Sequence, residues 1–166
     1  MSEPRAPAAA PQPKASPLTA VPRAAQPAPS PLPANWQDWP LTPGDWVYRR
    51  DDRGSVALFG RSGADADFLI RCVSATKRIY LSRSGAFSAG ITGLMTVRAF
   101  TTSKGYGVSN NGDTPPYVSA FLTPDDPLLD AVAFSRGRFT VSVKGAGDLV
   151  IPAWPEFARV VEDCRG

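Results

Sequence analysis

Hydrophobic and polar residues alternate with a period of two along most of the chain between Trp46 and Val143. This is the pattern of β-strands that bury one face. Pro, Gly, Asn and Asp residues separate the alternating segments at short intervals, as turns do. The pattern predicts about seven short strands. The segments concerned are 45–49, 55–60, 67–72, 78–82, 94–102, 117–122 and 139–144, with a last short strand at 149–151.

Turn signals define the first hairpin and one long connection. Thr42-Pro43-Gly44-Asp45 places Pro and Gly at the two central positions of a type II turn. Asp51-Asp52-Arg53-Gly54 predicts the turn that joins strands 45–49 and 55–60 into a hairpin. The segment Ser103–Pro116 is rich in Gly, Asn and Pro, so we expect a long loop there, with room for a small hairpin.

Two segments predict short helices. Asp126 before Pro127 is an N-cap followed by proline at the first helical position, and the helix continues to Phe134. Pro155 and Glu156 open a second helix, whose apolar stripe is Phe157, Val160, Val161 and Cys164. The predicted fold is therefore mainly β. We expect an antiparallel β-sandwich or partly open barrel with two short helices, one of them C-terminal.

Composition divides the chain into two parts. Residues 1–35 hold 10 of the 18 prolines and 10 alanines, with no glycine and no aromatic residue. Such a segment cannot bury enough apolar surface to order itself, so we predict a disordered Pro/Ala-rich tether at 1–35 and a single β-rich domain at 36–166. In polyproline II geometry the tether would reach on the order of 100 Å at most. Its PxxP-like spacings also suit a docking peptide.

The formal net charge of +3 belongs largely to the tether, which carries three basic residues against one acidic residue. The domain has 15 basic and 14 acidic residues, whereas nucleic-acid-binding domains usually show a clear basic excess. We therefore expect no nucleic-acid partner. Single-stranded nucleic acid remains a second alternative, on a strip of Arg49, Arg50, Arg53 and Arg61 beside Tyr48 and Phe59.

Candidate catalytic chemistry is sparse. The chain has no histidine, which excludes a Ser-His-Asp or Cys-His apparatus and a His-ligated zinc site within it. Ser74 and Lys77 have S-x-x-K spacing, but the segment predicts a turn rather than the helix that this chemistry needs. Asp125, Asp126 and Asp130 could supply oxygens to a hard cation, although Asp126 is better explained as a helix cap. We predict no enzyme and no catalytic, cofactor-binding or metal-binding residues.

The two cysteines form the one candidate covalent pair. Cys72 shares the inward face of its strand with Phe68 and Ile70, and Cys164 lies on the apolar stripe of the last helix. Both faces should point into the core, so a disulfide can form in an oxidising compartment and would add about 4 kcal/mol of stability. The alternative is a pair of buried reduced thiols, since free cysteine behaves as a small hydrophobic residue.

Two stretches carry a family resemblance, namely WPLTPGDWVY at Trp39–Tyr48 and DPLLDAVAFSRGRFTVSVKGAGDLVIPAWPEFARVVEDCR at Asp126–Arg165. They resemble a group of uncharacterised bacterial proteins. More distantly, the order of strands, late cysteine and terminal amphipathic segment is similar to the invasion-associated locus B family. That resemblance implies a small secreted β-rich domain of the bacterial envelope with no established catalytic residues.

These observations favour a non-enzymatic binding or structural module of the bacterial envelope, whose partner is an unknown protein or envelope component. The sequence has no stretch of 18 apolar residues, so we expect no transmembrane helix. A chain that starts at Met1 without a signal is expected in the cytoplasm, whereas an upstream signal or anchor would make it periplasmic or envelope-associated. The alternative function is a cytoplasmic small-molecule-binding domain or enzyme with its site under the 103–116 loop.

Overall fold

The computed structural model describes residues 31–166, of which Leu32–Gly166 form one compact unit. The predicted tether at 1–35 lies outside the described residues except for its last five positions. A short 3-10 helix, η1 (Trp36–Asp38), begins the folded part, and the Asn35 side chain caps it by accepting a hydrogen bond from the backbone N–H of Gln37.

Nine strands among the described residues form a single antiparallel sheet in the order β1-β2-β3-β4-β7-β6-β5-β8-β9. The mainly β prediction is confirmed, although the strand count is nine rather than seven. The bounds are β1 (Asp45–Asp51), β2 (Gly54–Gly60), β3 (Phe68–Val73), β4 (Arg78–Ser84), β5 (Gly93–Arg98), β6 (Ser103–Asn110), β7 (Tyr117–Leu122), β8 (Arg138–Val143) and β9 (Gly147–Pro152).

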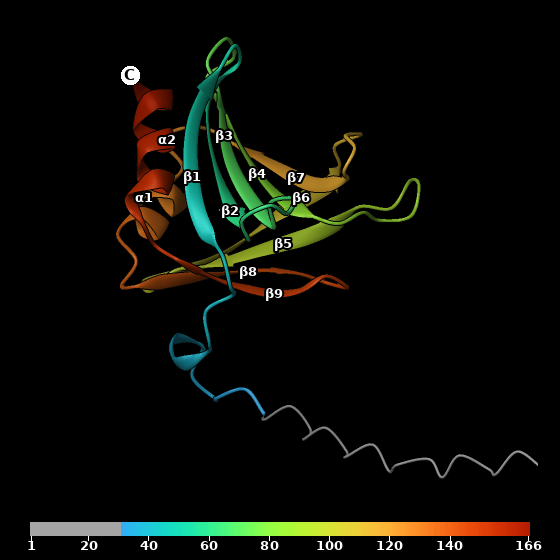
Figure 1. Ribbon diagram of the computed structural model, residues 1–166, viewed down its shortest axis with the longest axis vertical. Helices are drawn as coiled ribbons and strands as arrows, with labels where there is room; N and C mark the ends of the chain where they lie inside the picture. The colour runs from blue at the N-terminus through green and yellow to red at the C-terminus, as the bar shows by residue number, and fades with distance from the viewer. Residues whose placement is uncertain (1–30) are drawn as a thin grey trace, which may run out of the picture. The chain divides into compact units, whose positions relative to one another are not determined.

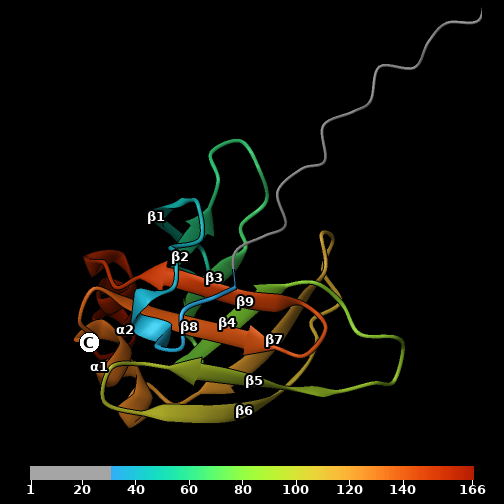
Figure 2. The ribbon, with the colours of Figure 1, turned by 90° about the horizontal axis from the view of Figure 1, so that it is seen from below.

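The sheet bends sharply and forms two layers that cross each other (Figures 1 and 2). Strands β1 to β4 and β7 make one layer, whereas β5, β8 and β9 make the other. β6 belongs to both layers, because its residues 103–108 pair with β5 and its last two residues pair with β7. The bend therefore lies along β6 and produces a partly open barrel.

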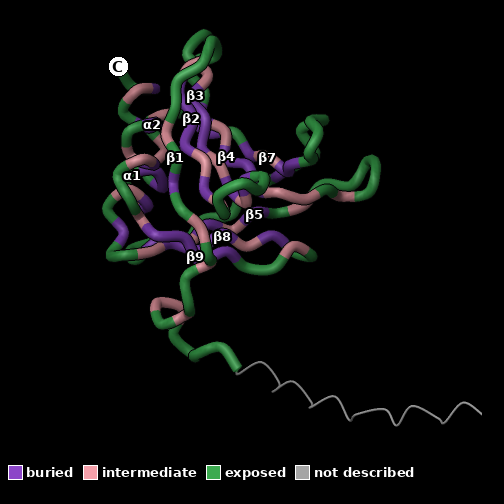
Figure 3. The backbone as a smooth tube through the Cα atoms, in the orientation of Figure 1, coloured by how far each residue is buried: buried purple, intermediate pink, exposed green. Residues whose placement is uncertain are grey.

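An aromatic cluster fills the space between the two layers. The ring of Phe68 on β3 lies 6.0 Å from that of Phe139 on β8, which joins the layers directly. Trp46 of β1 contacts Phe59 and Phe157, and these aromatic residues are buried. The core-facing residues Phe68, Ile70 and Cys72 of β3 are buried, as the period of two predicts, and the residues between them are buried or half-buried rather than exposed (Figure 3).

Two helices complete the core. α1 (Pro127–Ala133) is capped by Asp126, whose carboxylate accepts from the N–H of Leu128, as the sequence predicted. α2 (Pro155–Arg165) packs on β1 to β4 and buries the predicted stripe of Phe157, Val160, Val161 and Cys164. One face of the β1–β4 layer is therefore covered by α2, whereas no helix of the described residues packs on the other face.

The prediction of a loop at 103–116 is wrong for most of these residues. Residues 103–110 are the strand β6, and the predicted fifth strand ends at Arg98 rather than at Thr102. A tight turn closes this hairpin, since the Ala99 N–H donates to the carbonyl of Thr102. β6 shows almost no alternation because only Tyr106 and Val108 are not fully exposed, so periodicity could not reveal it.

The segment before β1 also differs from the prediction, because Thr42–Asp45 does not form a type II turn. Instead, the Thr42 N–H donates to the carbonyl of Val150 on β9, and the Val150 N–H donates to the Thr42 hydroxyl. Gly44 has φ +154°, and a Cβ there would lie 2.8 Å from the backbone of Gly60. The glycine therefore serves a close approach of two backbones rather than a turn.

The tryptophans at the start of the domain have different roles. Trp46 is buried in the core, and its indole N–H donates to the carbonyl of Pro152 over 2.9 Å. The carbonyl of Trp39 accepts a hydrogen bond from the guanidinium of Arg138 on β8. The segment that leads into β1 is thus fastened to the β8–β9 hairpin.

Candidate functional site

The uncovered face of the β1–β4 layer presents ordered rows of side chains. Strand pairing places Arg49, Val56, Arg71, Tyr80 and Phe121 side by side across β1, β2, β3, β4 and β7. The next row across the same strands is Val47, Leu58, Leu69, Ser82 and Ser119. Because side chains alternate along a strand, these residues lie opposite the core-facing ones and away from α2. We call this surface the outer face.

A groove of about 730 Å³ runs over the outer face. Its floor includes buried side chains on which no helix of the described part of the chain packs, among them Val56, Arg71 and Ser82. One end is bordered by Arg49 and Arg53, and the other by the loops 61–67 and 111–116. The volume lies within the usual range of small-ligand and peptide-segment sites.

An ion pair organises the basic end of the groove. Both Nη atoms of Arg71 contact the carboxylate of Asp51, at 2.9 and 2.8 Å, in a bidentate arrangement. The hydrogen bond from Arg71 lowers the pKa of Asp51 to about 2, with a further contribution from the N–H of Arg53. The pair is therefore fully charged at neutral pH, and it holds the Arg71 side chain, only 10% exposed, in the floor.

Hydroxyl groups occupy the centre and the far end. The Ser82 and Ser119 hydroxyls are hydrogen-bonded to each other at 2.6 Å. The Tyr117 hydroxyl donates to the carbonyl of Ala66 at 2.8 Å and so ties the 61–67 loop to β7. Burial, together with the nearby carboxylates of Asp65 and Asp67, raises the pKa of Tyr117, which therefore stays protonated as a donor.

Aromatic rings form one side of the groove. The rings of Tyr80 and Phe121 lie 6.5 Å apart, and the guanidinium of Arg78 lies 5.0 Å from the centre of the Phe121 ring. Phe121 is 62% exposed although it projects from the middle of the sheet. An exposed ring beside fixed hydroxyl and guanidinium groups offers both stacking and hydrogen bonding to a bound molecule.

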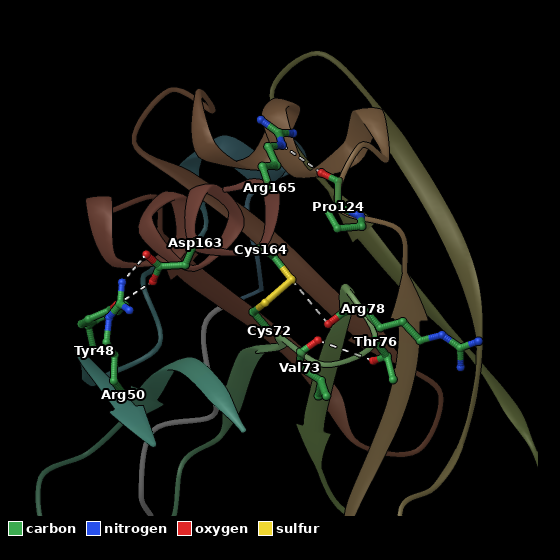
Figure 4. The surroundings of a disulfide bond; sticks show 10 residues. All are labelled: Tyr48, Arg50, Cys72, Val73, Thr76, Arg78, Pro124, Asp163, Cys164 and Arg165. Atoms are coloured by element: carbon green, nitrogen blue, oxygen red, sulfur yellow. Dashed lines mark hydrogen bonds and ion pairs between the residues drawn. A yellow bond between two sulfur atoms is a disulfide. The ribbon is translucent and has the colours of Figure 1, made fainter. Parts of the chain in front are cut away.

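The opposite face of the same strands is locked by a disulfide. Cys72 follows Arg71 on β3 and points to the other side of the sheet, where its sulfur is bonded to that of Cys164 on α2 (Figure 4). The Asp163 carboxylate, one residue before, accepts hydrogen bonds from Tyr48 at 2.5 Å and from Arg50 at 2.8 Å. The disulfide and these contacts hold α2 on the sheet behind the groove.

The structure separates the predicted strip of basic and aromatic residues. Arg49 and Arg53 line the groove, whereas Arg50 pairs with Asp163 beside α2. Phe59 is completely buried in the core. Because consecutive strand residues face opposite sides, this set forms no continuous surface for single-stranded nucleic acid.

The acidic residues considered as a possible source of oxygen ligands, Asp125, Asp126 and Asp130, have other partners in the structure. Asp126 caps α1 and also accepts from Lys104 and Tyr106, while Asp130 pairs with Arg165. Over residues 31–166, no group of three or more His, Cys, Asp or Glu side chains is placed to hold a metal ion. Ser74 and Lys77 lie in the turn between β3 and β4, as predicted.

The fold and the groove define a class, namely a disulfide-linked β domain with one helix-covered face and one grooved face. A search for relatives finds no matching family model, no matching curated protein and no matching solved structure. No helix of the described residues is long and apolar enough to cross a membrane.

Sequence reasoning did not identify the groove. Because Cys72 was placed on the inward face of its strand with Phe68 and Ile70, Leu69 and Arg71 fall on the opposite face, to which no binding site was assigned. One signal was available, since Val56, Leu58 and Leu69 are apolar at positions whose neighbours face the core. A strand that is apolar on both faces indicates a second buried or binding surface.

Proposed function

We propose that this protein is a non-enzymatic binding module of the bacterial envelope, and that the outer-face groove holds a segment of its partner, a protein or another envelope component. The observation that carries the proposal is the groove itself, a hollow of about 730 Å³ on a sheet face that no helix of residues 31–166 covers. The fixed Arg71, the Ser82–Ser119 pair and the exposed Phe121 ring supply the contacts. Since these groups supply hydrogen bonds and stacking, they suit recognition.

Three further observations support the proposed location in the bacterial envelope. The Cys72–Cys164 disulfide suits an oxidising environment, where such bonds persist. The Pro/Ala-rich composition of residues 1–35 suits a spacer that holds the domain away from an anchor. The distant resemblance that the order of strands and the late cysteine suggest to the invasion-associated locus B family is the third ground of this proposal.

Site-specific photocrosslinking in cells of the source bacterium tests the groove. A photoreactive phenylalanine analogue replaces Phe121 in the groove and, as the matched control, Phe134 at the end of α1, which is 82% exposed. We expect a discrete adduct from position 121 and none from position 134. An Arg49→Glu/Arg53→Glu variant of the same protein should lose the adduct, because it reverses the charge at one end of the groove.

Two results would overturn the proposal. Identical adducts from positions 121 and 134 would mean that the groove has no special role, and no adduct from position 121 would mean that nothing binds there. The compartment is tested separately by a free-thiol assay on protein isolated from its native source. Two reduced thiols at Cys72 and Cys164 would exclude the oxidising envelope location.

A further inference from the structure

A second cavity lies between the two layers of the barrel, apart from the outer-face groove. It has a volume of about 480 Å³ and is bordered by the end of β4, the loop 85–91 and the turn between β8 and β9. Val118 and Val143, core-facing residues of β7 and β8, form part of its wall. The cavity therefore opens the interior of the barrel to solvent, a common place for ligand sites in β-barrels.

A buried arginine lines this cavity. Arg83 of β4 lies between Phe68 and Val118 on the neighbouring strands and is only 8% exposed. Its guanidinium donates to the carbonyl and hydroxyl of Ser84 and to the carbonyl of Ala146, all of them neutral groups. Its buried Nε–H has no hydrogen-bond partner among the described residues.

The charge of Arg83 is uncompensated by any ion pair within residues 31–166. Arg71, the other buried arginine, has the Asp51 carboxylate at 2.8 Å, whereas Arg83 has no carboxylate at ion-pair distance. Burial lowers the pKa of Arg83, and the more distant Asp67 opposes this only in part. A buried charge without a counter-charge is costly, so a bound anion would stabilise this site.

The other charged side chain that lines the cavity is also positive. Lys144, in the β8–β9 turn, is its second cation, and it makes no ion pair within the described part of the chain. Among residues 31–166, no Asp or Glu side chain lines the cavity, and the remaining members of the wall are small, polar or apolar, with Phe87 and Ile91 the largest. A cationic patch beside an apolar surface suits a ligand that has both a negatively charged group and an apolar part.

We propose that this cavity binds a small amphipathic anion, an oxyanion group (carboxylate or phosphate) on an apolar chain. The oxyanion lies between Arg83 and Lys144, and the apolar chain contacts Phe87 and Ile91. Arginine favours oxyanions because its N–H groups form a planar fork that fits two oxygens. This site is independent of the outer-face groove, so its failure would leave the groove proposal untouched.

Calorimetric titration of the full chain with three eight-carbon probes tests the proposal. Octanoate and octyl phosphate carry the two oxyanions, and octan-1-ol has the same chain without the charge. We expect saturable binding of at least one anion and at least about tenfold weaker binding of the alcohol, as the loss of a charged hydrogen-bonded group predicts. Which anion binds more tightly identifies the head group.

Two variants locate the site without disturbing the buried arginine. Ile91→Glu places a carboxylate in the cavity wall and should weaken anion binding about tenfold or more through repulsion. Leu94→Glu is the matched control, because Leu94 is exposed to nearly the same extent (57% against 55%) and does not line the cavity. Lys144→Gln should weaken binding about two- to fivefold, the size of an exposed charge interaction.

Three outcomes would overturn the proposal. They are equal binding of octan-1-ol and the anions, no binding of either anion, and equal loss of binding in the Ile91→Glu and Leu94→Glu variants. The first would show apolar binding alone, and the third would show that the anion binds elsewhere on the surface.

Discussion

Cys72 of β3 and Cys164 of α2 are 92 residues apart in sequence, and their sulfurs are bonded with the Cα atoms 5.5 Å apart. The bond joins the C-terminal helix to the centre of the first sheet layer, directly behind the floor of the outer-face groove. It therefore closes a loop that contains most of the domain, and we expect its removal to destabilise the whole fold.

Replacement of both cysteines by alanine should lower the free energy of unfolding by about 2–5 kcal/mol, because the unfolded chain regains the freedom that the closed loop removes. Urea denaturation measures the difference. Wild-type protein with and without reductant is the control for the loss of side-chain volume at Cys72 and Cys164. An unchanged denaturation midpoint on reduction would contradict the prediction.

Stability should depend on the Asp51–Arg71 pair at low pH. The pKa of Asp51 is about 2 in the folded protein, below its ordinary value of 3.8, so the contribution of the pair is complete above about pH 4 and is lost as the pH falls toward 2. Because Asp51 is partly exposed, solvent screening limits the effect to about 1 kcal/mol. Asp51→Asn should remove this pH dependence.

Denaturation of the wild type and of Asp51→Asn at several pH values between 5 and 2.5 measures this pH dependence of stability. Asp52→Asn is the matched control, since Asp52 is an exposed neighbour in the same turn that makes no ion pair within the described residues. A pH profile of Asp51→Asn parallel to that of wild type would show that the pair does not contribute.

The hydrogen bond from Tyr48 to Asp163 should stabilise the docking of α2. Tyr48→Phe removes a 2.5 Å bond to a carboxylate and should cost about 1–2 kcal/mol. It should also speed amide hydrogen exchange in α2. Tyr80→Phe makes the same chemical change at a hydroxyl with no hydrogen bond in the described part of the chain, and it should be nearly neutral. Equal effects of the two variants would refute the specific role of Tyr48.

Gly54 should tolerate no side chain. It has φ +142°, and a Cβ there would lie 2.4 Å from the carbonyl oxygen of Cys72. Gly54→Ala should therefore destabilise the protein by about 1–3 kcal/mol. Gly107→Ala on β6, where a Cβ meets nothing within 4 Å, should be neutral or slightly stabilising. Thermal unfolding of both variants makes the comparison, and equal loss of stability in both would contradict the prediction.

Much of the fold could be predicted because local patterns report local burial. The alternation in 67–72 placed Phe68, Ile70 and Cys72 on one face, and the structure buries all three. The helical stripe that ends at Cys164 is buried as well. β6 escaped prediction because its Gly-containing, mostly exposed sequence depends on pairing with β5 and β7 rather than on a buried face of its own.

The candidate sites could not be predicted in the same way, because each is assembled from separate strands. Arg71 and Phe121 share a row only because β4 pairs with β7, across the β5–β6 hairpin in the chain. Arg83 and Lys144 line one cavity only because the sheet bends at β6 and brings β4 near the β8–β9 turn. No spacing along the chain encodes either relationship.

By itself, the sequence determined the mainly β class, the two helices and the inward faces of both cysteines, because side-chain alternation and helix caps act over a few residues. The tertiary structure alone decided which strands are neighbours, which arginine gains a carboxylate partner and where the grooved face lies. These depend on strand register and on the bend of the sheet, which arise from contacts between residues distant in the chain.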